Sequence, residues 1–434
     1  IATPLATPLL KTQRRPYLRE PSTGRALNLD EMELLFLGTS SGEPTLTRNQ
    51  QALALRAAGH AWLFDCGEAT QHRLGLSRTS CSDIRRIFVS HLHGDHIFGL
   101  PGLICGIAAS AIDSLDASPK FTEENPLVVV GPAGIRAFLR ASLSNAYASL
   151  HGLRLQIHEI DEFRCYRRGR HMRPPVHVSR PHRVEVPGLT LLPEEDGSWL
   201  VPASPMDLPI AVRAVELDHT VPTVGWVLTE EPRPGKLSPG KVVPLLKKHQ
   251  MPLMLLQKLK AGIPIELPDG QVIRPEDHVG PATQRKLALL SDTRDVPRTA
   301  TAHSKGATLV VHECTNACTS DDLANGSSYA DVERYARSHG HSTPQIAGRF
   351  ARDVGAGHLV LTHFSSRYPG DGSHFSRRIM SEIRGLARQQ FRGGVTCASD
   401  LMLLNISADG TIDVCDERDA MHRGAKGGTA VERS

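Results

Sequence analysis

The sequence lacks a hydrophobic run as long as a membrane-spanning helix requires, which is about 20 consecutive apolar residues, so we predict no membrane segment. It also lacks a Cys-x-x-Cys pair, which argues against a structural zinc site made of thiolates. A large excess of one charge is missing too: the formal net charge is +4, so affinity for nucleic acid must come from local patches. We interpret the eight scattered cysteines as reduced thiols of an intracellular protein; they stand at positions 66, 81, 105, 165, 314, 318, 397 and 415.

The two ends of the chain have compositions that are typical of segments outside a folded core. Residues 1–19 contain basic residues and no acidic residue, as at the end of an organellar transit peptide. We assign residues 1–30 to a leader, which either directs the protein to a plastid or mitochondrion or carries no address and leaves it in the cytoplasm or nucleus. Residues 416–434 are charged and glycine-rich, and we predict a disordered tail there.

A dense group of metal-ligand side chains follows an apolar run. Residues 84–89 form that run, which is interrupted by two arginines, and predict a buried strand. His91, His93, Asp95 and His96 come after it, beyond Ser90. Two neutral imidazoles suit Zn²⁺, and a carboxylate with a further imidazole can hold a second ion.

Further ligands follow predicted strands elsewhere, where rigid elements present side chains with precision. A two-metal hydrolase needs several such ligands, with the ions roughly 3.5–4 Å apart. We assign one ion to His91, His93, His219 and Asp292, and the other to Asp95, His96, Asp292 and His363. Asp292 is the predicted bridge, because a carboxylate has two oxygens to share.

These motifs resemble those of a known superfamily and of one family within it. His-x-His-x-Asp-His at 91–96 resembles the metallo-β-lactamase signature. Further segments resemble tRNase Z in its short form, the tRNA 3′-end processing endonuclease; they include residues 36–39, 44–49, 63–68, 218–222, 233–237, 290–293, 312–313, 340–344 and 362–368. The resemblance implies an α/β (α+β) fold, a four-layer αββα sandwich with two mixed sheets, over residues 31–415. It also implies two Zn²⁺ ions per subunit, with Mn²⁺ as the alternative, and a homodimer that acts on precursor tRNA.

The resemblance also implies catalytic roles. Asp95 would accept a proton from the attacking hydroxide while holding a metal, and His341 would stabilise the phosphorane or protonate the leaving 3′ oxygen. Glu313 would orient His341. The products would be a tRNA with a 3′-hydroxyl and a trailer with a 5′-phosphate. The alternative for His341 is a structural residue at a helix start.

Three more residues have two interpretations each. Asp65 either braces His91 or His93 through a hydrogen bond or forms a buried turn. Arg48 and Asn49 either lie near the phosphate, as the resemblance implies, or belong to a surface loop.

Two basic segments interrupt the alternation of strands and helices. In the first, 159–210, seven arginines and no acid lie between Arg164 and Arg183; it either adds RNA contacts or is disordered. In the second, 231–281, seven Lys or Arg and no acid lie between Pro232 and Ile265. The resemblance implies that this second segment is an arm that grips tRNA through phosphates, and the predicted contacts are Lys236, Lys241, Lys247 and Lys248. Its Pro and Gly content argues against a packed core, so we expect it to protrude. Its tip, 250–258, lacks the glycines that are usual in the family.

Two other functions stay open on the sequence. A small-molecule ester or thioester hydrolase of the same superfamily would share the first motif but would have no use for an acid-free lysine arm. A non-catalytic RNA-binding relic would have lost metal ligands, whereas all seven candidates are present.

Overall fold

The computed structural model describes residue 29 and residues 31–112, 120–164, 180–204, 207–233 and 235–417. Apart from Leu29, the predicted leader lies outside the described residues, and so do residues 165–179 of the arginine-rich segment and residues 418–434 of the predicted tail. Among the helices in the described ranges, none has the length and apolar character that crossing a membrane would take.

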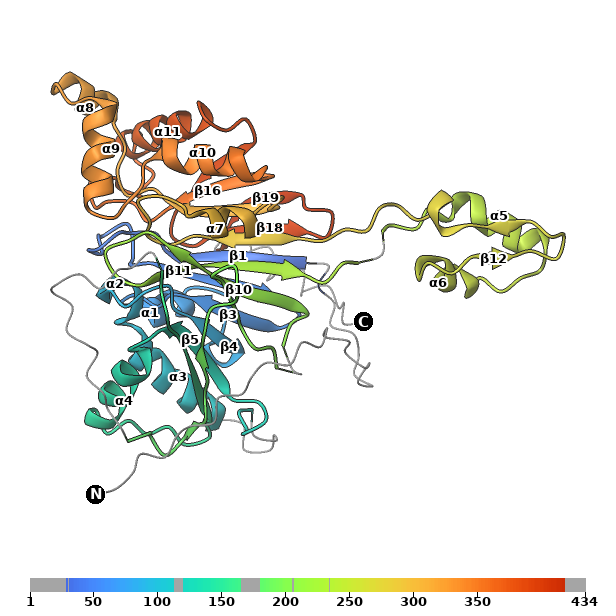
Figure 1. Cartoon of the computed structure of the whole chain (residues 1–434), viewed down its shortest axis with the longest axis horizontal. Helices are drawn as coiled ribbons and strands as arrows, with labels where there is room; N and C mark the ends of the chain where they lie inside the picture. Colours follow the sequence, from blue (N-terminus) through green and yellow to red (C-terminus); the bar gives the residue numbers. More distant parts are fainter. Residues whose placement is uncertain are drawn as a thin grey trace, which may run out of the picture.

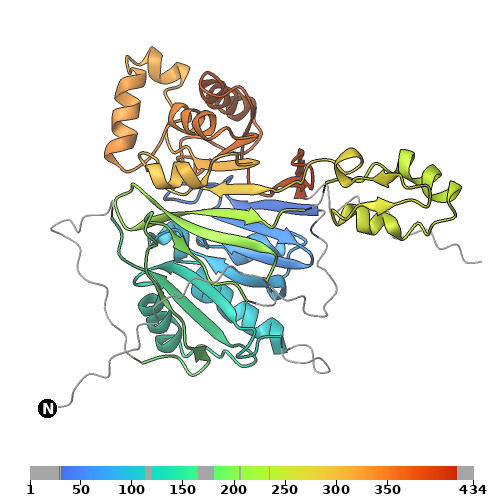
Figure 2. The same ribbon diagram turned by 45° about the vertical axis from the view of Figure 1, so that its right-hand side comes forward.

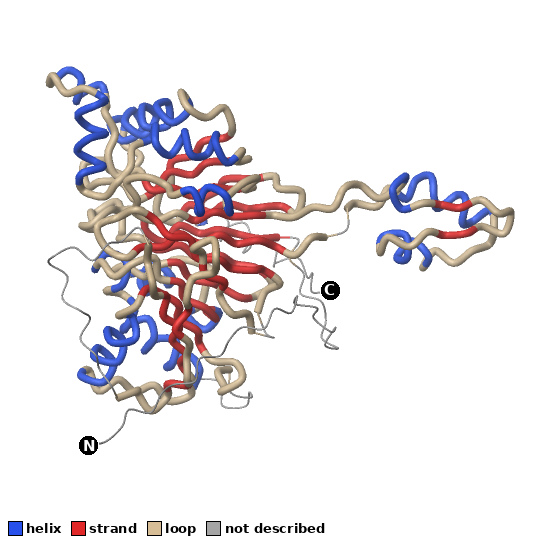
Figure 3. The backbone as a smooth tube through the Cα atoms, in the orientation of Figure 1, coloured by secondary structure: helices blue, strands red, loops and turns tan. Residues whose placement is uncertain are grey.

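Two mixed β-sheets pack face to face and form the centre of the molecule (Figures 1 and 3). The first sheet has the order β19 (Ile412–Asp416), β18 (Met402–Ser407), β1 (Glu31–Gly38), β2 (Ala52–Ala57), β3 (His60–Phe64), β4 (Ile84–Phe88), β5 (Leu127–Pro132), β6 (Leu155–Ile160) and β7 (Glu185–Val186), and β8 (Thr190–Leu191) also pairs with β6. The second has the order β17 (Gly394–Cys397), β16 (His358–Thr362), β15 (Leu309–Glu313), β14 (Lys286–Leu289), β11 (Thr223–Glu230), β10 (Ile210–Leu217) and β9 (Trp199–Leu200). Strands β3 to β6 are parallel, as are β14 to β17.

Side-chain alternation along the strands explains why both faces of each sheet are apolar. In β1, Leu34 and Phe36 face the opposite sheet, whereas Leu35 and Leu37 face the helices. Because both faces are covered, such strands appear in the sequence as continuous apolar runs. Phe88 of β4 and Trp226 of β11 join the two sheets, with ring centroids 5.1 Å apart.

Helices cover the outer faces of both sheets and complete the predicted αββα sandwich, which is thereby confirmed (Figures 1 and 2). On the first sheet lie α1 (Thr70–Gly75), η1 (Cys81–Asp83), α2 (Gly94–Ile97), α3 (Leu100–Ile112) and α4 (Ile135–Asn145). On the side of the second lie α7 (Arg298–His303), α8 (Ser320–Ala324), α9 (Tyr329–Ser338), α10 (Pro344–Val354) and α11 (His374–Arg388).

Residues 231–285 leave the second sheet between β11 and β14 and form a projecting arm (Figure 1). It contains α5 (Pro239–Lys248), α6 (Leu255–Lys260), β12 (Ile265–Glu266), β13 (Val272–Ile273) and η2 (Pro275–Asp277). Its two-stranded stalk is held by backbone hydrogen bonds between Arg233 and Thr283 of 2.9 and 3.0 Å. Gly235 is needed there, because a Cβ would collide with the carbonyl of Gly280.

The arm has a small core of its own, so the expectation that its Pro and Gly content excludes one is wrong. Its buried members are Val242, Leu246, Leu259, Ile265, Leu267 and Ile273. The two helices and the β12–β13 hairpin each contribute apolar residues to this cluster. Segments rich in Pro and Gly can therefore bury apolar side chains when they pack against each other.

Two predicted boundaries also differ from the structure. In the described part of segment 159–210, β7 and β8 extend the first sheet and Trp199 of β9 is buried between the sheets. Two-residue strands are too short to show a period in the sequence. At the C-terminus, Asp416 ends β19, and the buried carboxylate of Glu417 lies 2.6 Å from the Arg56 guanidinium, so the ordered chain extends into the predicted tail.

Candidate metal centre

The predicted ligands are delivered by the ends of strands from both sheets. The strand β4 leads to His91 and His93, and the short helix α2 carries Asp95 and His96; His219 follows β10, Asp292 follows β14 and His363 follows β16. All seven come together at one edge of the sandwich.

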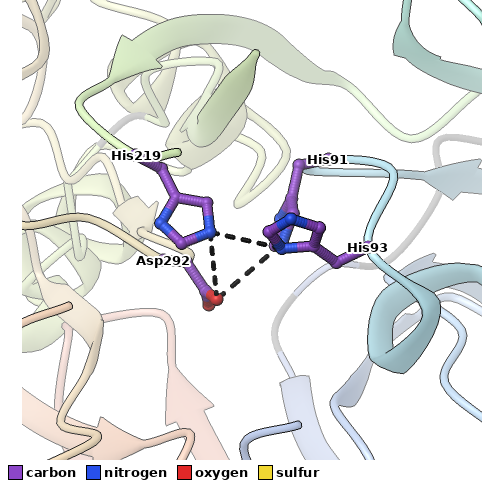
Figure 4. A group of neighbouring side chains, drawn as sticks. All are labelled: His91, His93, His219 and Asp292. Atoms are coloured by element: carbon purple, nitrogen blue, oxygen red, sulfur yellow. Dashed lines mark hydrogen bonds and ion pairs between the residues drawn. The ribbon is translucent and has the colours of Figure 1, made fainter. Parts of the chain in front are cut away.

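The first group consists of His91, His93, His219 and Asp292, whose ligand atoms lie within 4.8 Å of one another (Figure 4). The Nδ1 atom of His93 lies 3.1 Å from Nε2 of His91 and 3.3 Å from Nε2 of His219. The Oδ2 atom of Asp292 lies 3.8 Å from Nε2 of His91 and 3.7 Å from Nε2 of His219. Three imidazole nitrogens and a carboxylate oxygen facing one point are a ligand set that suits Zn²⁺.

The second group consists of Asp95, His96 and His363, with Asp292 beside it. The Nε2 atoms of His96 and His363 are 3.2 Å apart, and each lies 3.4 Å from Oδ2 of Asp95. The Oδ1 atom of Asp292 lies 3.6 Å from Nε2 of His96 and 3.3 Å from Nδ1 of His363. Asp292 therefore offers one oxygen to each group.

An unsatisfied buried oxygen shows that the donor set fits a cation. Among the described residues, Oδ1 of Asp292 is buried and has no hydrogen-bond donor. Leaving a buried carboxylate oxygen unpaired is costly, and a bound cation removes that cost.

The electrostatics of the cluster keep its carboxylates ionised. Burial alone would raise the pKa of Asp292, but the charge of surrounding imidazoles, that of His363 first, outweighs burial and holds the pKa well below its usual range. Asp95 behaves in the same way, and there His96 is the main counteracting charge that lowers the pKa. Burial lowers the pKa of His219 to about 4, which favours the neutral imidazole. Ionised carboxylates and neutral imidazoles are the forms that bind metal. His96 differs from His219, because the charges of Asp95 and Asp65 outweigh burial and raise its pKa, so that a bound cation would have to displace a proton there.

The Asp65 carboxylate supports a different histidine from the two that we predicted. Its Oδ2 atom lies 2.8 Å from Nδ1 of His96, and its Oδ1 accepts a 2.7 Å hydrogen bond from the Ser90 backbone. It reaches His91 only through Ser90, whose Oγ lies 3.0 Å from His91 Nδ1. The spacing of residues in the sequence does not determine side-chain conformations. It therefore could not show which histidine the Asp65 carboxylate would contact.

Other supports were not predicted at all. The carbonyl of Gly340 lies 2.8 Å from Nδ1 of His219, and Oγ1 of Thr315 lies 3.1 Å from Nδ1 of His363. Such contacts fix the orientation of a ligand ring. His363 also has a φ of 58°, in the left-handed region that non-glycine residues rarely adopt.

Glu313 and His341 form a pair beside the cluster. The Nδ1 atom of His341 lies 3.2 Å from Oε1 of Glu313 and 3.8 Å from Oδ2 of Asp292. Burial lowers the pKa of His341, but the charge and hydrogen bond of Glu313 outweigh it and raise the pKa to about 9. Glu313 is itself fixed, because the backbone N–H groups of Thr293, Thr315 and Ser342 each donate to it at 3.0 Å. His341 precedes α10, for which Thr343 is the N-cap residue.

Arg48 and Asn49 lie inside the protein, which does not favour direct contact with a phosphate. Arg48 is 1% exposed, and its guanidinium donates to the carbonyls of Tyr368 and Ala398 and to the Thr39 hydroxyl. The Asn49 side chain donates to a backbone carbonyl at 2.9 Å. These residues hold the 44–49 loop in place.

The predicted RNA-binding lysines do not belong to the cluster. Lys236 lies in the stalk of the arm, Lys241, Lys247 and Lys248 lie on α5, and all four side chains are exposed. The helix α5 lies in the projecting arm, away from the sheets (Figure 1). The structure thus places these four lysines apart from the candidate metal centre.

Comparison with known proteins places the chain among named hydrolases. Residues 32–108 match a family model described as Anti-Pycsar protein Apyc1. The human protein named zinc phosphodiesterase ELAC protein 1 is 35% identical over 342 residues, which cover 78% of this chain and 87% of that protein. The ribonuclease Z of Halalkalibacterium halodurans is 35% identical over 344 residues, or 78% of this chain and 89% of that protein. The crystal structure of human tRNase Z, short form (ELAC1), covers 86% of this chain and 98% of its own, with 27% identity and a TM-score of 0.51.

The αββα sandwich and the histidine- and aspartate-rich edge define a hydrolase of the metallo-β-lactamase fold. The 35% sequence identity to these relatives, over most of both sequences, identifies the family within this class. The chain belongs to the tRNase Z (ribonuclease Z) family, in its short form.

Proposed function

We propose that this chain is a metal-dependent endonuclease that removes the 3′ trailer from precursor tRNA. The observation that carries the proposal is the convergence of the predicted ligands on Asp292, with the Glu313–His341 pair 3.8 Å from the same carboxylate. The name tRNase Z of the matched human structure supports the substrate class.

The donor set is suited to two Zn²⁺ ions per subunit, with Mn²⁺ as the alternative. One ion would be held by His91, His93, His219 and Asp292, and the other by Asp95, His96, Asp292 and His363. When bound, such cations activate water and neutralise charge on the phosphate.

The chain's own residues would move the protons. Asp95, whose side chain is 11% exposed, would accept a proton from the attacking water; its Oδ2 is positioned by a 2.8 Å hydrogen bond from the Gly42 N–H. His341, oriented by Glu313, would donate a proton to the departing 3′ oxygen. A new O–P bond forms and the P–O3′ bond breaks, so the tRNA keeps a 3′-hydroxyl and the trailer keeps the 5′-phosphate.

The arm would hold the body of the tRNA away from the cut. Its lysines Lys236, Lys241, Lys247 and Lys248 are exposed and free to approach phosphates. We propose a homodimer in which the arm of one protomer serves the centre of its partner.

The test uses a labelled precursor tRNA with a 3′ trailer, incubated with the metal-loaded protein with and without a chelator. We expect cleavage at the trailer junction that leaves a 3′-hydroxyl on the tRNA and that the chelator abolishes. Metal-loaded, folded protein that hydrolyses thioesters or other small esters but leaves the RNA intact would overturn the proposal.

A further inference from the structure

An exposed aromatic side chain stands beside the candidate metal centre. Phe98 follows α2, three residues after Asp95, and is 63% exposed. Its ring lies over Gly94, where an added Cβ would collide with the ring atoms. Residues three apart in a helical turn are neighbours on its surface, so the ring lies on the Asp95 side of the turn.

The core does not account for this exposure. Ile97 and Leu100, which flank Phe98 closely, are buried in the cluster between the first sheet and its helices, whereas Phe98 is turned away from it. A second apolar side chain, Leu46, is fully exposed in the loop whose Gly42 N–H donates to Asp95. The two segments that meet at Asp95 therefore both present apolar side chains to solvent.

A phosphate gains nothing from an apolar surface, but a nucleobase does. Bases stack on aromatic side chains whatever their identity, because every base has a π-face. Unpaired nucleotides in RNA are commonly held in this way. An exposed ring next to a phosphodiester-cleaving centre is therefore suited to a base adjacent to the bond that is cut.

We propose that Phe98 is a stacking platform for a nucleobase beside the scissile phosphate. This inference rests on the proposed function and adds a substrate-binding residue to it. The ring would hold the unpaired base while the phosphate lies over the metal ligands. The base belongs either to the last nucleotide of the tRNA or to the first nucleotide of the trailer.

The experiment compares wild type, Phe98→Ala, Phe98→Trp and the control Phe375→Ala, all metal-loaded. Phe375 is a matched exposed phenylalanine on α11, a helix that supplies none of the predicted ligands. Each protein is given three precursor tRNAs: one intact, one abasic at the last tRNA nucleotide and one abasic at the first trailer nucleotide. We measure kcat/KM for cleavage, together with metal content and thermal midpoint.

For the intact substrate, Phe98→Ala should lower kcat/KM by about tenfold to a hundredfold, the usual range for loss of one base–aromatic stack. Phe98→Trp should restore cleavage, and Phe375→Ala should resemble wild type. For one of the abasic substrates, Phe98→Ala and wild type should cleave at equal rates, which identifies the stacked base.

The proposal is overturned if Phe98→Ala cleaves the intact substrate like wild type, or if its defect is equally large on both abasic substrates. A loss of metal content in Phe98→Ala that Phe98→Trp does not repair would also overturn it, because the ring would then merely support Gly94. Failure of the wild type to cleave any precursor tRNA is a different result, since it refutes the proposed function itself.

Discussion

The candidate metal centre and the arm differ in almost every physical respect. His91 and His96 are fully buried, and each ring has a defined polar neighbour: Ser90 for His91 and Asp65 for His96. Lys241 and Lys247 stand on an exposed helix of a projecting unit with its own core. Cleaving a bond requires atoms held to a fraction of an ångström, whereas gripping a polyanion requires charge and reach.

The arm also separates its charges. Five of its lysines lie along α5 and α6, whereas acids such as Glu266 and Asp269 lie on or next to the hairpin strands. A 3.2 Å ion pair between His249, which follows α5, and Asp269 joins the two sets of elements. The arm thus keeps one set of elements basic, although the segment 231–281 as a whole is not free of acids.

Removing a ligand should have the largest effect and should separate the two regions most clearly. His93→Ala removes one nitrogen of the first group, and we expect kcat to fall by about a thousandfold or more, equivalent to ~4 kcal/mol of transition-state stabilisation. Binding of precursor tRNA should be almost unchanged, because the arm is intact. Single-turnover cleavage and filter binding test this, with the exposed His151→Ala as the control. Loss of binding in His93→Ala would show that the two regions are not independent.

Deleting the arm should have the opposite pattern. With residues 236–279 replaced by two glycines, the affinity for precursor tRNA should fall by roughly a hundredfold, because several phosphate contacts are lost. Hydrolysis of bis(p-nitrophenyl) phosphate should be unchanged, since the arm's core is separate from the body. A marked loss of hydrolysis of this small substrate would mean that the arm supports the centre directly.

Within the centre, Glu313→Gln should produce a smaller and more specific defect. We expect kcat to fall by about 10- to 100-fold, as is typical when the partner of a functional side chain is removed. Glu313 raises the pKa of His341, so its neutralisation lowers that pKa. A proton-donating His341 is active below its pKa, so the alkaline limb of the kcat–pH profile should move to lower pH. An unchanged profile would remove His341 from the reaction.

Within the arm, the smallest effect is expected from two lysines. Lys247→Ala combined with Lys248→Ala should weaken tRNA binding by about three- to tenfold at moderate salt, and the slope of log K against log salt should decrease by about one per lost contact. Lys305→Ala, outside the arm, is the control. Equal weakening by the control would show that the effect is one of net charge.

The sequence could predict which side chains would come together because their signal is local. A continuous apolar run indicates a strand buried on both faces, and a His or Asp directly after it lies at the sheet edge, as with Asp292 after β14 and His363 after β16. The chemistry of the donor set then restricts how the ligands are grouped.

The supports of the site could not be predicted because they depend on packing between distant segments. The sequence around Gly340 does not indicate that its carbonyl contacts His219. The sequence around Asp65 likewise does not indicate that its carboxylate contacts His96 rather than another histidine. An arginine in a loop would be expected at the surface. The guanidinium of Arg48 is nevertheless buried, and it donates hydrogen bonds to the carbonyls of Tyr368 and Ala398, which lie far away in the sequence. The arm's core could not be predicted for a related reason: its apolar residues are interrupted by Pro and Gly, and their burial depends on how the two helices pack against the β12–β13 hairpin.

The left-handed backbone of His363 has a consequence for how this protein can change. A non-glycine residue there costs on the order of 1–3 kcal/mol, and glycine would avoid that cost while removing a predicted ligand. Stability and activity therefore make opposite demands on position 363, and the same conflict holds for Asp65, whose φ is 59°. With the roles that we propose for these side chains, relaxing the backbone at either position would come at the expense of the reaction, so gains in thermal resistance must be sought elsewhere in the fold.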